Sequence, residues 1–448
     1  MMGTRLPTDP GGVAAWLRER GADGLVGMET LSCDLSSRLR GRIRVSPEDF
    51  FVAEILRSGS VATSPTYRMD HEGNIPLYVL SKIDLDTITA VREFSAALGL
   101  RPWEVEYLGL KDKRAVTSQF VFPTGFHGMP PPKLSGGKWE ASMHAMLGRP
   151  LRPLDLCGNL FWILVRLSDP VPTPELQDLL SEFTHKVCET GLLNFFGYQR
   201  FGGRKPINHV AGYLIAKRDY DAATRVILGT PSDSEEEPLR RARASFLEGG
   251  RREGFQCLAR SPFILERSLA KNLIRYKGDN RKSILKLPSI LLRFLLESFS
   301  AFLFNIAVSG MKDRLLSWRA QEDMLYVPLD DRASPLTTCV RATSSSLGAI
   351  EDDLSKRKAV AAVVCPGFLM GKALTKELAQ VMDELEVSCS SFHLEERPEA
   401  GYPGQVRAAV AIPKTISAAP TGHQSVFLRF FLPRSSYATV LLRELLTR

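Results

Sequence analysis

Alternating apolar and polar positions mark several short segments in the first half of the chain. The two-residue period of a β-strand predicts strands over residues 51–55, 76–82, 105–108 and 160–167. In the first of these, Phe51, Ala53 and Ile55 form one apolar face and leave Phe50 on the other. The pattern alone favours a core position for Phe50, and a position lining a cleft is the alternative.

A helical period replaces this alternation between Thr87 and Leu98. Residues 84–87 offer an N-cap, apolar residues then recur every three or four positions, and Gly99 ends the pattern. The expected buried face consists of Ile88, Val91, Phe94 and Leu98. The order strand, helix, strand leads directly into residues 109–120.

The character of the chain changes after about residue 215, where long helical patterns and charged loops replace the short strands. A strand-like segment returns at residues 426–432, and because a final strand needs a partner, we expect it to pair with the first part of the chain. The pattern predicts an α+β protein in three segments: residues 1–215 begin one domain, residues 216–415 form an inserted α+β domain, and residues 416–448 complete the first.

Composition narrows the class of protein. The 448 residues exceed one ordinary core, and 58 Lys and Arg against 50 Asp and Glu give a net charge of +8, which suits a polyanionic partner. The seven cysteines are dispersed without the spacing of a zinc site or disulfide framework. No signal-peptide pattern opens the chain, and charges interrupt the apolar residues 284–308, which predicts a buried helix there. We therefore expect a cytoplasmic protein, with no membrane contact and no bound metal.

One acidic residue, Asp112, lies between two lysines directly after a predicted strand. Strand ends carry functional loops on a rigid frame. The cations Lys111, Lys113 and Arg114 favour an ionised carboxylate by Coulomb attraction, which suits a base or a nucleophile better than a proton donor. Judged by spacing alone, a solvated turn with a salt bridge explains the same residues.

A second dense segment, residues 193–203, interleaves aromatic residues with Arg, Gln and Gly. Such a composition suits RNA, because bases stack on aromatic rings while cations and amides meet phosphates and base edges. A loop that buries an aromatic cluster in the core is the alternative, and composition barely separates the two.

Four separated segments together resemble the TruD family of tRNA pseudouridine synthases, and the archaeal and eukaryotic members more than the bacterial ones. They are Pro47-Glu48-Asp49-Phe50 with Glu54, Gly109-x-Lys111-Asp112-x-x-Ala115-Val116-Thr117-x-Gln119, Asn194-Phe195-Phe196-Gly197-x-Gln199-Arg200-Phe201-Gly202, and Leu432-Pro433 with Ser436-Tyr437-Ala438-Thr439 and Arg443-Glu444. Phe304-Asn305 and Pro366-Gly367 look like family landmarks within the insertion.

The resemblance implies a fold and a reaction. The fold would be a catalytic domain with a mixed or antiparallel sheet flanked by helices, interrupted by a large inserted α+β TRUD domain. The enzyme would isomerise uridine to pseudouridine, at position 13 of tRNA, by cutting the N–C glycosidic bond and joining the ribose to C5 of the base. This chemistry requires no cofactor and no metal, and tRNA would be the partner of a monomeric enzyme.

The resemblance also implies roles for individual residues. Asp112 would be the catalytic nucleophile or base, and Arg44 would pair with it where bacterial members often carry Lys. Phe196 would be the stacking platform for the uridine. Further pocket residues would be Phe50, Asn194 and Tyr437, the last where bacterial members carry Phe, and RNA contacts would come from Lys111, Lys113, Arg114, Gln199 and Arg200.

Two other functions remain as alternatives. An RNA-binding or RNA-chaperone protein would keep the fold without the activity, although a pure binder has no use for a carboxylate in an RNA-facing cleft. A carboxylate-dependent glycosidase would need a second acid opposite Asp112, and Glu54 and Asp49 are the nearby motif candidates.

Overall fold

The chain forms two compact units in the computed structural model, which describes residues 6–63, 73–203, 205–232, 235–249 and 251–447. The sheet unit comprises residues 32–192, 328–337 and 411–448, and the helical unit comprises residues 1–31, 193–327 and 338–410. The chain passes between the units after residues 31, 192, 327, 337 and 410. Residues before 32 also belong to the helical unit.

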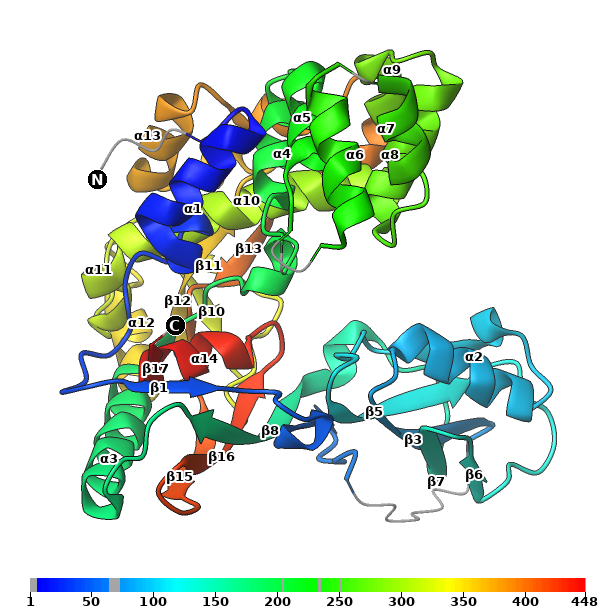
Figure 1. Cartoon of the computed structure of the whole chain (residues 1–448). Helices are drawn as coiled ribbons and strands as arrows, with labels where there is room; N and C mark the ends of the chain where they lie inside the picture. Colours follow the sequence, from blue (N-terminus) through cyan, green and yellow to red (C-terminus); the bar gives the residue numbers. More distant parts are fainter. Residues whose placement is uncertain (1–5, 64–72, 204, 233–234, 250, 448) are drawn as a thin grey trace. The chain divides into compact units, whose positions relative to one another are not determined.

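A large mixed sheet dominates the sheet unit (Figure 1). Its described strands are β1 (Leu39–Arg42), β2 (Phe50–Leu56), β3 (Ile75–Ile83), β4 (Val105–Tyr107), β5 (Val116–Pro123), β6 (Lys133–Ser135), β7 (Trp139–Leu147), β8 (Leu156–Leu167), β15 (Lys414–Pro420), β16 (Ser425–Pro433) and β17 (Leu446–Thr447). The main order is β15-β16-β8-β2-β5-β3-β7-β6. The helices are α2 (Thr87–Ala97), α3 (Thr173–Thr190) and α14 (Ala438–Leu445).

Pairing of the strands joins distant parts of the sequence. The last long strand, β16, pairs antiparallel with β8, with Phe430 opposite Phe161. This confirms the expected pairing of the final strand with the first part of the chain. Strands β2 and β5 pair in parallel, with Phe51 opposite Val116. Because parallel strands start at the same edge of a sheet, the residues before β2 and before β5 are brought together there.

One face of the sheet collects the polar side chains that matter for the site. The pairings place Glu54 opposite Asn159 and Leu80 opposite Gln119. Since side chains alternate between faces, Phe50 and Glu54 of β2 share one face with Asn159 of β8. Helix α2 packs on the sheet through Ala90, Val91 and Phe94.

The structure corrects the expected buried face of α2 at one position. The helix begins after the N-cap Asp86, whose side chain accepts a hydrogen bond from the Thr89 amide, as the sequence predicts. Val91 and Phe94 are buried, but Ile88 is 63% exposed. Thr87 and Ala90 take its place in the buried face. The inward position of Thr87 turns the first turn of the helix toward the loop that carries Asp112.

The helical unit surrounds one long apolar helix, α10 (Ser289–Gly310) (Figure 1). The other described helices are α1 (Pro10–Leu25), α4 (Asn208–Ala216), α5 (Tyr220–Gly229), α6 (Glu237–Leu247), α7 (Arg251–Leu258), α8 (Ile264–Arg275), α9 (Asn280–Leu285), α11 (Lys312–Leu316), α12 (Leu347–Ser355) and α13 (Lys376–Glu384). A sheet in the order β11 (Val340–Arg341), β10 (Leu325–Pro328), β12 (Ala359–Cys365), β13 (Gln405–Ala408) completes the unit. Helix α10 is long and apolar enough to span a membrane, but 72% of its most apolar window is buried. The prediction of a buried core helix is confirmed.

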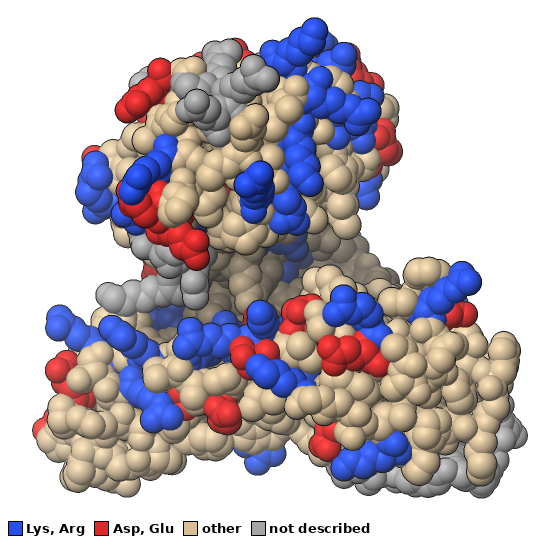
Figure 2. Space-filling view, turned by 45° about the vertical axis from the view of Figure 1, so that its right-hand side comes forward, with Lys and Arg blue, Asp and Glu red and all other residues tan. Residues whose placement is uncertain are grey.

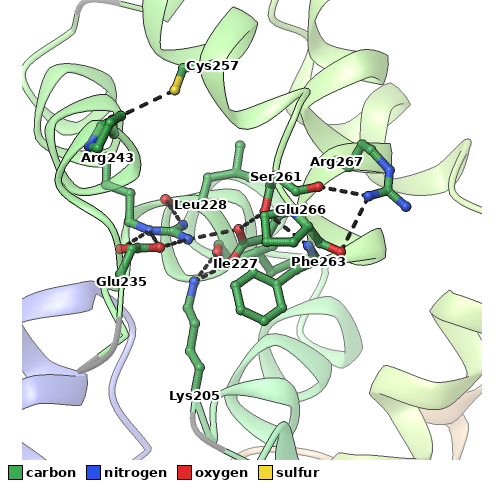
Figure 3. Close-up of polar contacts among 12 residues, drawn as sticks. Lys205, Ile227, Leu228, Glu235, Arg243, Cys257, Ser261, Phe263, Glu266 and Arg267 are labelled. Carbon is green, nitrogen blue, oxygen red and sulfur yellow. Dashed lines mark hydrogen bonds and ion pairs between the residues drawn. The ribbon is translucent and has the colours of Figure 1, made fainter. Parts of the chain in front are cut away.

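A buried cluster of charges joins the loop after residue 202 to helices α6 and α8 (Figure 3). The Lys205 ammonium lies 2.7 Å from a Glu266 carboxylate oxygen, and the Arg243 guanidinium lies 2.8 Å from the other oxygen. Arg243 also pairs with Glu235, and the Ser261 hydroxyl donates to Glu266 at 2.8 Å. Burial lowers the pKa of Lys205 to about 8, although Glu266 opposes the shift. The cluster therefore satisfies charges that would otherwise be costly inside the protein.

Candidate active site

The loop that carries Asp112 is held by side chains from three neighbouring elements. The Thr87 hydroxyl of α2 accepts a hydrogen bond from the Lys111 amide at 2.9 Å. The Gln119 amide of β5 donates to the Gly109 carbonyl at 3.2 Å, and the Lys82 ammonium of β3 donates to the Asp112 carbonyl at 2.9 Å. These contacts fix the backbone on both sides of Asp112.

The Lys111 ammonium is bound by side chains of the sheet. Its ammonium lies 2.9 Å from a Glu54 carboxylate oxygen and donates to the Asn159 side chain at 2.8 Å. Glu54 is fully buried, and its other oxygen accepts from the Phe120 amide at 2.8 Å. Lys111 therefore anchors the loop to the face of the sheet.

Arg44 is the cation that pairs with Asp112. The guanidinium lies 2.5 Å from the Asp112 carboxylate, with both side chains about a quarter exposed. The residues before β2 and before β5 thus meet at the shared sheet edge. Burial lowers the pKa of Arg44, while the neighbouring Asp112 raises it in part. The pairing implied by the family resemblance is confirmed, although the roles of the two residues in a reaction stay a proposal.

The Phe50 ring packs against Arg44 of this ion pair. The Arg44 guanidinium lies 4.0 Å from the centre of the Phe50 ring, a cation–π contact. The ring is only 1% exposed and meets Phe161 edge-on at 6.1 Å. Phe50 is therefore a buried core residue, as the pattern alone favours, and it also contacts Arg44 of the candidate site.

The acids considered as a second glycosidase carboxylate are both engaged in ion pairs. Arg166 binds Asp49 with two hydrogen bonds, at 2.7 and 3.0 Å. The Arg166 hydrogen bond, together with that from the Ser46 amide, lowers the pKa of Asp49 against the effect of burial. Glu54 is buried against Lys111. Neither arrangement suits an acid that must donate a proton.

Lys82 is a titratable residue beside the Asp112 loop that could not be recognised from the sequence pattern. Its side chain is buried and donates to the carbonyls of Leu85 and Asp112. Burial lowers its pKa to about 8, although Asp112 and Asp86 oppose the shift. Its position inside a predicted strand hid it, because burial of a lysine depends on what packs against the strand.

The predicted residues Phe196 and Asn194 lie in the helical unit. Arg407 of β13 places its guanidinium 4.0 Å from the centre of the Phe196 ring, and the Phe304 ring meets Phe196 edge-on at 5.4 Å. Asn305 accepts from the Phe196 amide at 2.8 Å and donates to its carbonyl at 3.1 Å. Phe196 is thus 5% exposed and firmly positioned.

Asn194 is tied to the same strand. Its side-chain amide donates to the Ala408 carbonyl at 2.9 Å, and its side-chain oxygen accepts from Arg407 at 3.2 Å. Arg200 pairs with Glu297 at 3.0 Å, and Gln199 is exposed. Arg407 links Asn194 to Phe196, a role that sequence spacing gives no way to see because more than 200 residues separate it from both.

The remaining predicted residues lie in the sheet unit. Tyr437 is half-buried and precedes α14. That helix is held by Glu444, whose carboxylate accepts from the Ser32 amide and hydroxyl, both at 2.9 Å. Arg114 donates to the Val45 carbonyl at 3.1 Å, and Lys113 is exposed. The structure therefore groups Arg44, Phe50 and Asp112 in one unit and Asn194 and Phe196 in the other.

Comparison with known proteins decides the family. A model of the family described as tRNA pseudouridine synthase D (TruD) matches residues 25–445, nearly the whole chain. The chain belongs to the TruD family. It is therefore a pseudouridine synthase, an isomerase that acts on tRNA, with an α+β fold.

Individual TruD proteins match over almost their full length. A probable tRNA pseudouridine synthase D of Pyrococcus abyssi is 31% identical over 411 residues, which cover 90% of this chain and 96% of that protein. A similarly described protein of Methanosarcina barkeri is 28% identical and covers 94% and 96%. The crystal structure of a TruD protein from Methanosarcina mazei superposes with a TM-score of 0.74 at 26% identity, covering 94% of this chain and 97% of that one. The named relatives are archaeal, in line with the branch indicated by the sequence.

Among the residues that the structure describes, no group of three or more His, Cys, Asp or Glu side chains is arranged to hold a metal ion. The expectation that catalysis needs no metal or cofactor stays a prediction, because it rests on the chemistry of the reaction.

Proposed function

We propose that this TruD protein converts uridine 13 of tRNA to pseudouridine, with Asp112 as the catalytic nucleophile or base. The observation that carries the proposal is the Asp112–Arg44 ion pair on a loop anchored by Thr87, Gln119 and Lys82. A carboxylate held in this way is prepositioned beside a cation, which suits a nucleophile or base.

The reaction balances without an external reagent. The bond between N1 of uracil and C1′ of the ribose breaks, and a new bond joins C5 to C1′. The proton at C5 leaves to solvent, and N1 gains one proton, so that substrate and product are isomers. We propose that the Asp112 carboxylate takes one of two roles. As a nucleophile it forms a bond to C1′ as the bond to N1 breaks, and C5 displaces it when the new bond to C1′ forms. As a base it removes a proton from C2′ of the ribose as the bond to N1 breaks and returns that proton when C5 joins C1′.

Arg44 would hold the carboxylate until the substrate binds. A guanidinium stays charged throughout the pH range of the reaction and forms directional hydrogen bonds to a carboxylate. The Phe50 ring, whose centre lies 4.0 Å from the Arg44 guanidinium, packs against that guanidinium. We therefore propose that Phe50 serves the site through Arg44.

We propose that three residues contact the uridine: Phe196, Asn194 and Tyr437. Further contacts to the RNA are proposed for Lys111, Lys113, Arg114, Gln199 and Arg200. A uridine must leave its stack before chemistry on the base can occur, and an aromatic side chain stabilises the extruded base. Among these RNA contacts, Lys113 and Gln199 are exposed, whereas the Lys111 ammonium forms an ion pair with Glu54. Lys111 is therefore better assigned to holding the loop than to RNA.

The position of modification is tested by incubating the purified protein with an unmodified tRNA transcript and mapping pseudouridine by chemical labelling and primer extension. We expect one modified site, uridine 13, and none when that uridine is replaced by cytidine. Modification at another uridine only would contradict the assignment of position while leaving the reaction intact.

A pH dependence follows from Lys82. With a pKa lowered to about 8, Lys82 is an ammonium below that pH, where it holds the Asp112 carbonyl by a charge-assisted hydrogen bond. Above that pH it is a neutral amine and holds the loop less firmly. We expect the single-turnover rate to fall as the pH rises through about 8. Lys82→Met should show a lower rate and no such step, whereas the exposed Lys138→Met should behave like wild type. A step that persists in Lys82→Met would contradict this origin.

Replacing the Phe196 ring should separate turnover from affinity. Phe196→Leu keeps apolar volume but cannot stack on a base, so we expect turnover to fall by roughly 10- to 100-fold. Affinity for tRNA should change little, because phosphate contacts dominate it. The control is Phe304→Leu, which alters the buried neighbouring ring. Equal losses of turnover in both variants, or equal losses of turnover and affinity in Phe196→Leu, would contradict a stacking role.

A further inference from the structure

Helices α8 and α9 carry a concentrated positive charge. Residues 260–286 contain eight Lys and Arg against two acidic residues, a net charge of +6, whereas the whole chain has +8. One of the two acids, Glu266, is buried against Lys205 and Arg243. Figure 2 shows lysine and arginine side chains gathered in a band over the upper body, which contains these helices.

The cations lie on the outer side of α8. The buried residues of this helix are Glu266, Leu269, Ala270 and Leu273. Lys271 and Arg275 are exposed and four residues apart, and therefore lie on the same side of the helix about 6 Å apart along its axis. Exposed Lys277 and Lys282 continue the charge into α9. We call Lys271, Arg275, Lys277 and Lys282 the α8–α9 basic surface.

These four cations are not neutralised by the protein. Within the described part of the chain, none of them forms an ion pair, whereas the neighbouring Arg281 pairs with Glu396 at 2.8 Å and Arg267 donates to the Ser261 carbonyl. Uncompensated cations repel one another and lower stability, so a solvated surface gains nothing from grouping them. An anionic partner would relieve that repulsion.

An aromatic ring lies among the cations. Tyr276 joins α8 to the turn before α9, with the Lys282 ammonium 5.0 Å and the Arg275 guanidinium 5.8 Å from the ring centre. A half-buried aromatic side chain flanked by cations is typical of surfaces that bind nucleic acid, because the cations meet phosphates while the ring offers a stacking face. Neither an acidic peptide nor a lipid headgroup requires that ring.

The buried charge cluster holds the helix that carries this surface. Figure 3 shows Glu266 on α8 between Lys205 and Arg243, which come from the loop after residue 202 and from α6. At the start of the same helix Arg267 binds the Ser261 carbonyl at 2.8 Å. The inward face of α8 is thus anchored by directional contacts, and its outward cations are presented on a rigid element.

We propose that the α8–α9 basic surface binds the phosphate backbone of the tRNA substrate through Lys271 and Arg275, with Tyr276 stacking on a base. This inference rests on the proposed function only for the identity of the RNA. The surface acts on binding and not on chemistry, because no residue in it belongs to the proposed catalytic group.

The test compares Lys271→Ala/Arg275→Ala with Lys358→Ala/Lys376→Ala, which removes two exposed cations from other positions of the helical unit. Binding of unmodified tRNA is measured across a series of salt concentrations, and the single-turnover rate is measured at saturating enzyme. For the first variant we expect weaker binding, a salt slope reduced by about 2, and an unchanged single-turnover rate. The control variant should keep the wild-type slope.

Several outcomes would overturn the proposal. A wild-type slope in the first variant, or an equal reduction in both variants, excludes a specific phosphate contact. The same is true if the first variant loses binding only to vesicles of phosphatidylserine and phosphatidylcholine in equal parts. If wild-type protein binds tRNA with the expected slope but forms no pseudouridine, the proposed function fails while the basic surface stands.

Discussion

Asp112→Asn is expected to lose pseudouridine formation almost completely, with a single-turnover rate reduced by roughly 10⁴-fold or more, the scale seen when a catalytic nucleophile or base is removed. The side chain keeps its shape and loses its charge, so it can neither attack carbon nor accept a proton. Arg44 then loses the carboxylate 2.5 Å away, and its burial is less well compensated. Stability should fall somewhat, and binding of tRNA should persist because it depends on phosphate contacts.

Glu48→Gln is the matched control for this variant. Glu48 is an exposed acid of the same unit, close in sequence to Arg44 and Phe50, and its neutralisation changes the net charge by the same amount. We expect a rate close to that of wild type. A comparable loss in both variants would point to a general electrostatic effect and contradict a specific role for Asp112.

Glu266→Gln is expected to cause the largest loss of stability in the helical unit, about 3–5 kcal/mol in the free energy of unfolding. The carboxylate binds both Lys205 and Arg243, and both cations are buried. Arg243 keeps its ion pair with Glu235, whereas the remaining hydrogen-bond partners of Lys205 among the described residues would be the Ile227 carbonyl and the neutral amide. The buried Lys205 ammonium thus loses its direct ion-pair partner.

The pH dependence of this loss has a definite sign. The folded pKa of Lys205, about 8, lies below its ordinary value of 10.5, so the charged lysine destabilises the fold below pH 8. That cost disappears as the pH rises from 8 toward 10.5. The defect of Glu266→Gln should therefore shrink with rising pH as Lys205 becomes neutral.

Hydrogen exchange of α8 provides the measurement, because it reports on this unit separately. The control is Glu248→Gln, at an exposed position directly after α6, and it should exchange like wild type. Lys205→Met combined with Glu266→Gln should recover part of the lost protection, since it removes the unpaired charge. No recovery in the double variant, or a defect that grows with pH, would contradict this account of the cluster.

The sequence allowed much of the secondary structure to be predicted. Strand periodicity located β3, β8 and β16, and the cap at Asp86 located the start of α2. The error at Ile88 arose because a helical period identifies apolar positions but not the direction from which the sheet approaches. Tertiary packing chose Thr87 and Ala90 instead, and so turned a polar side chain toward the Asp112 loop.

The candidate site was only partly accessible from sequence. Motif spacing singled out Asp112, and the family resemblance supplied its partner Arg44, but the lysine next to Asp112 proved to be bound to Glu54. Adjacent residues in a loop need not form an ion pair with each other, because the loop directs their side chains to different partners. Lys82 and Arg407 could not be predicted, since each acts through burial and contacts that exist only once distant strands have paired.

Release of tritium from tRNA labelled at C5 of uracil tests the central claim most directly, because the proton at C5 leaves only when the ribose is joined to that carbon. The wild-type protein is predicted to release tritium in proportion to the uridine converted. Asp112→Ala is predicted to release none above background while still binding the labelled tRNA. Full release by Asp112→Ala would contradict the assignment of Asp112 as the catalytic residue, and no release by the wild type would contradict pseudouridine formation on that tRNA.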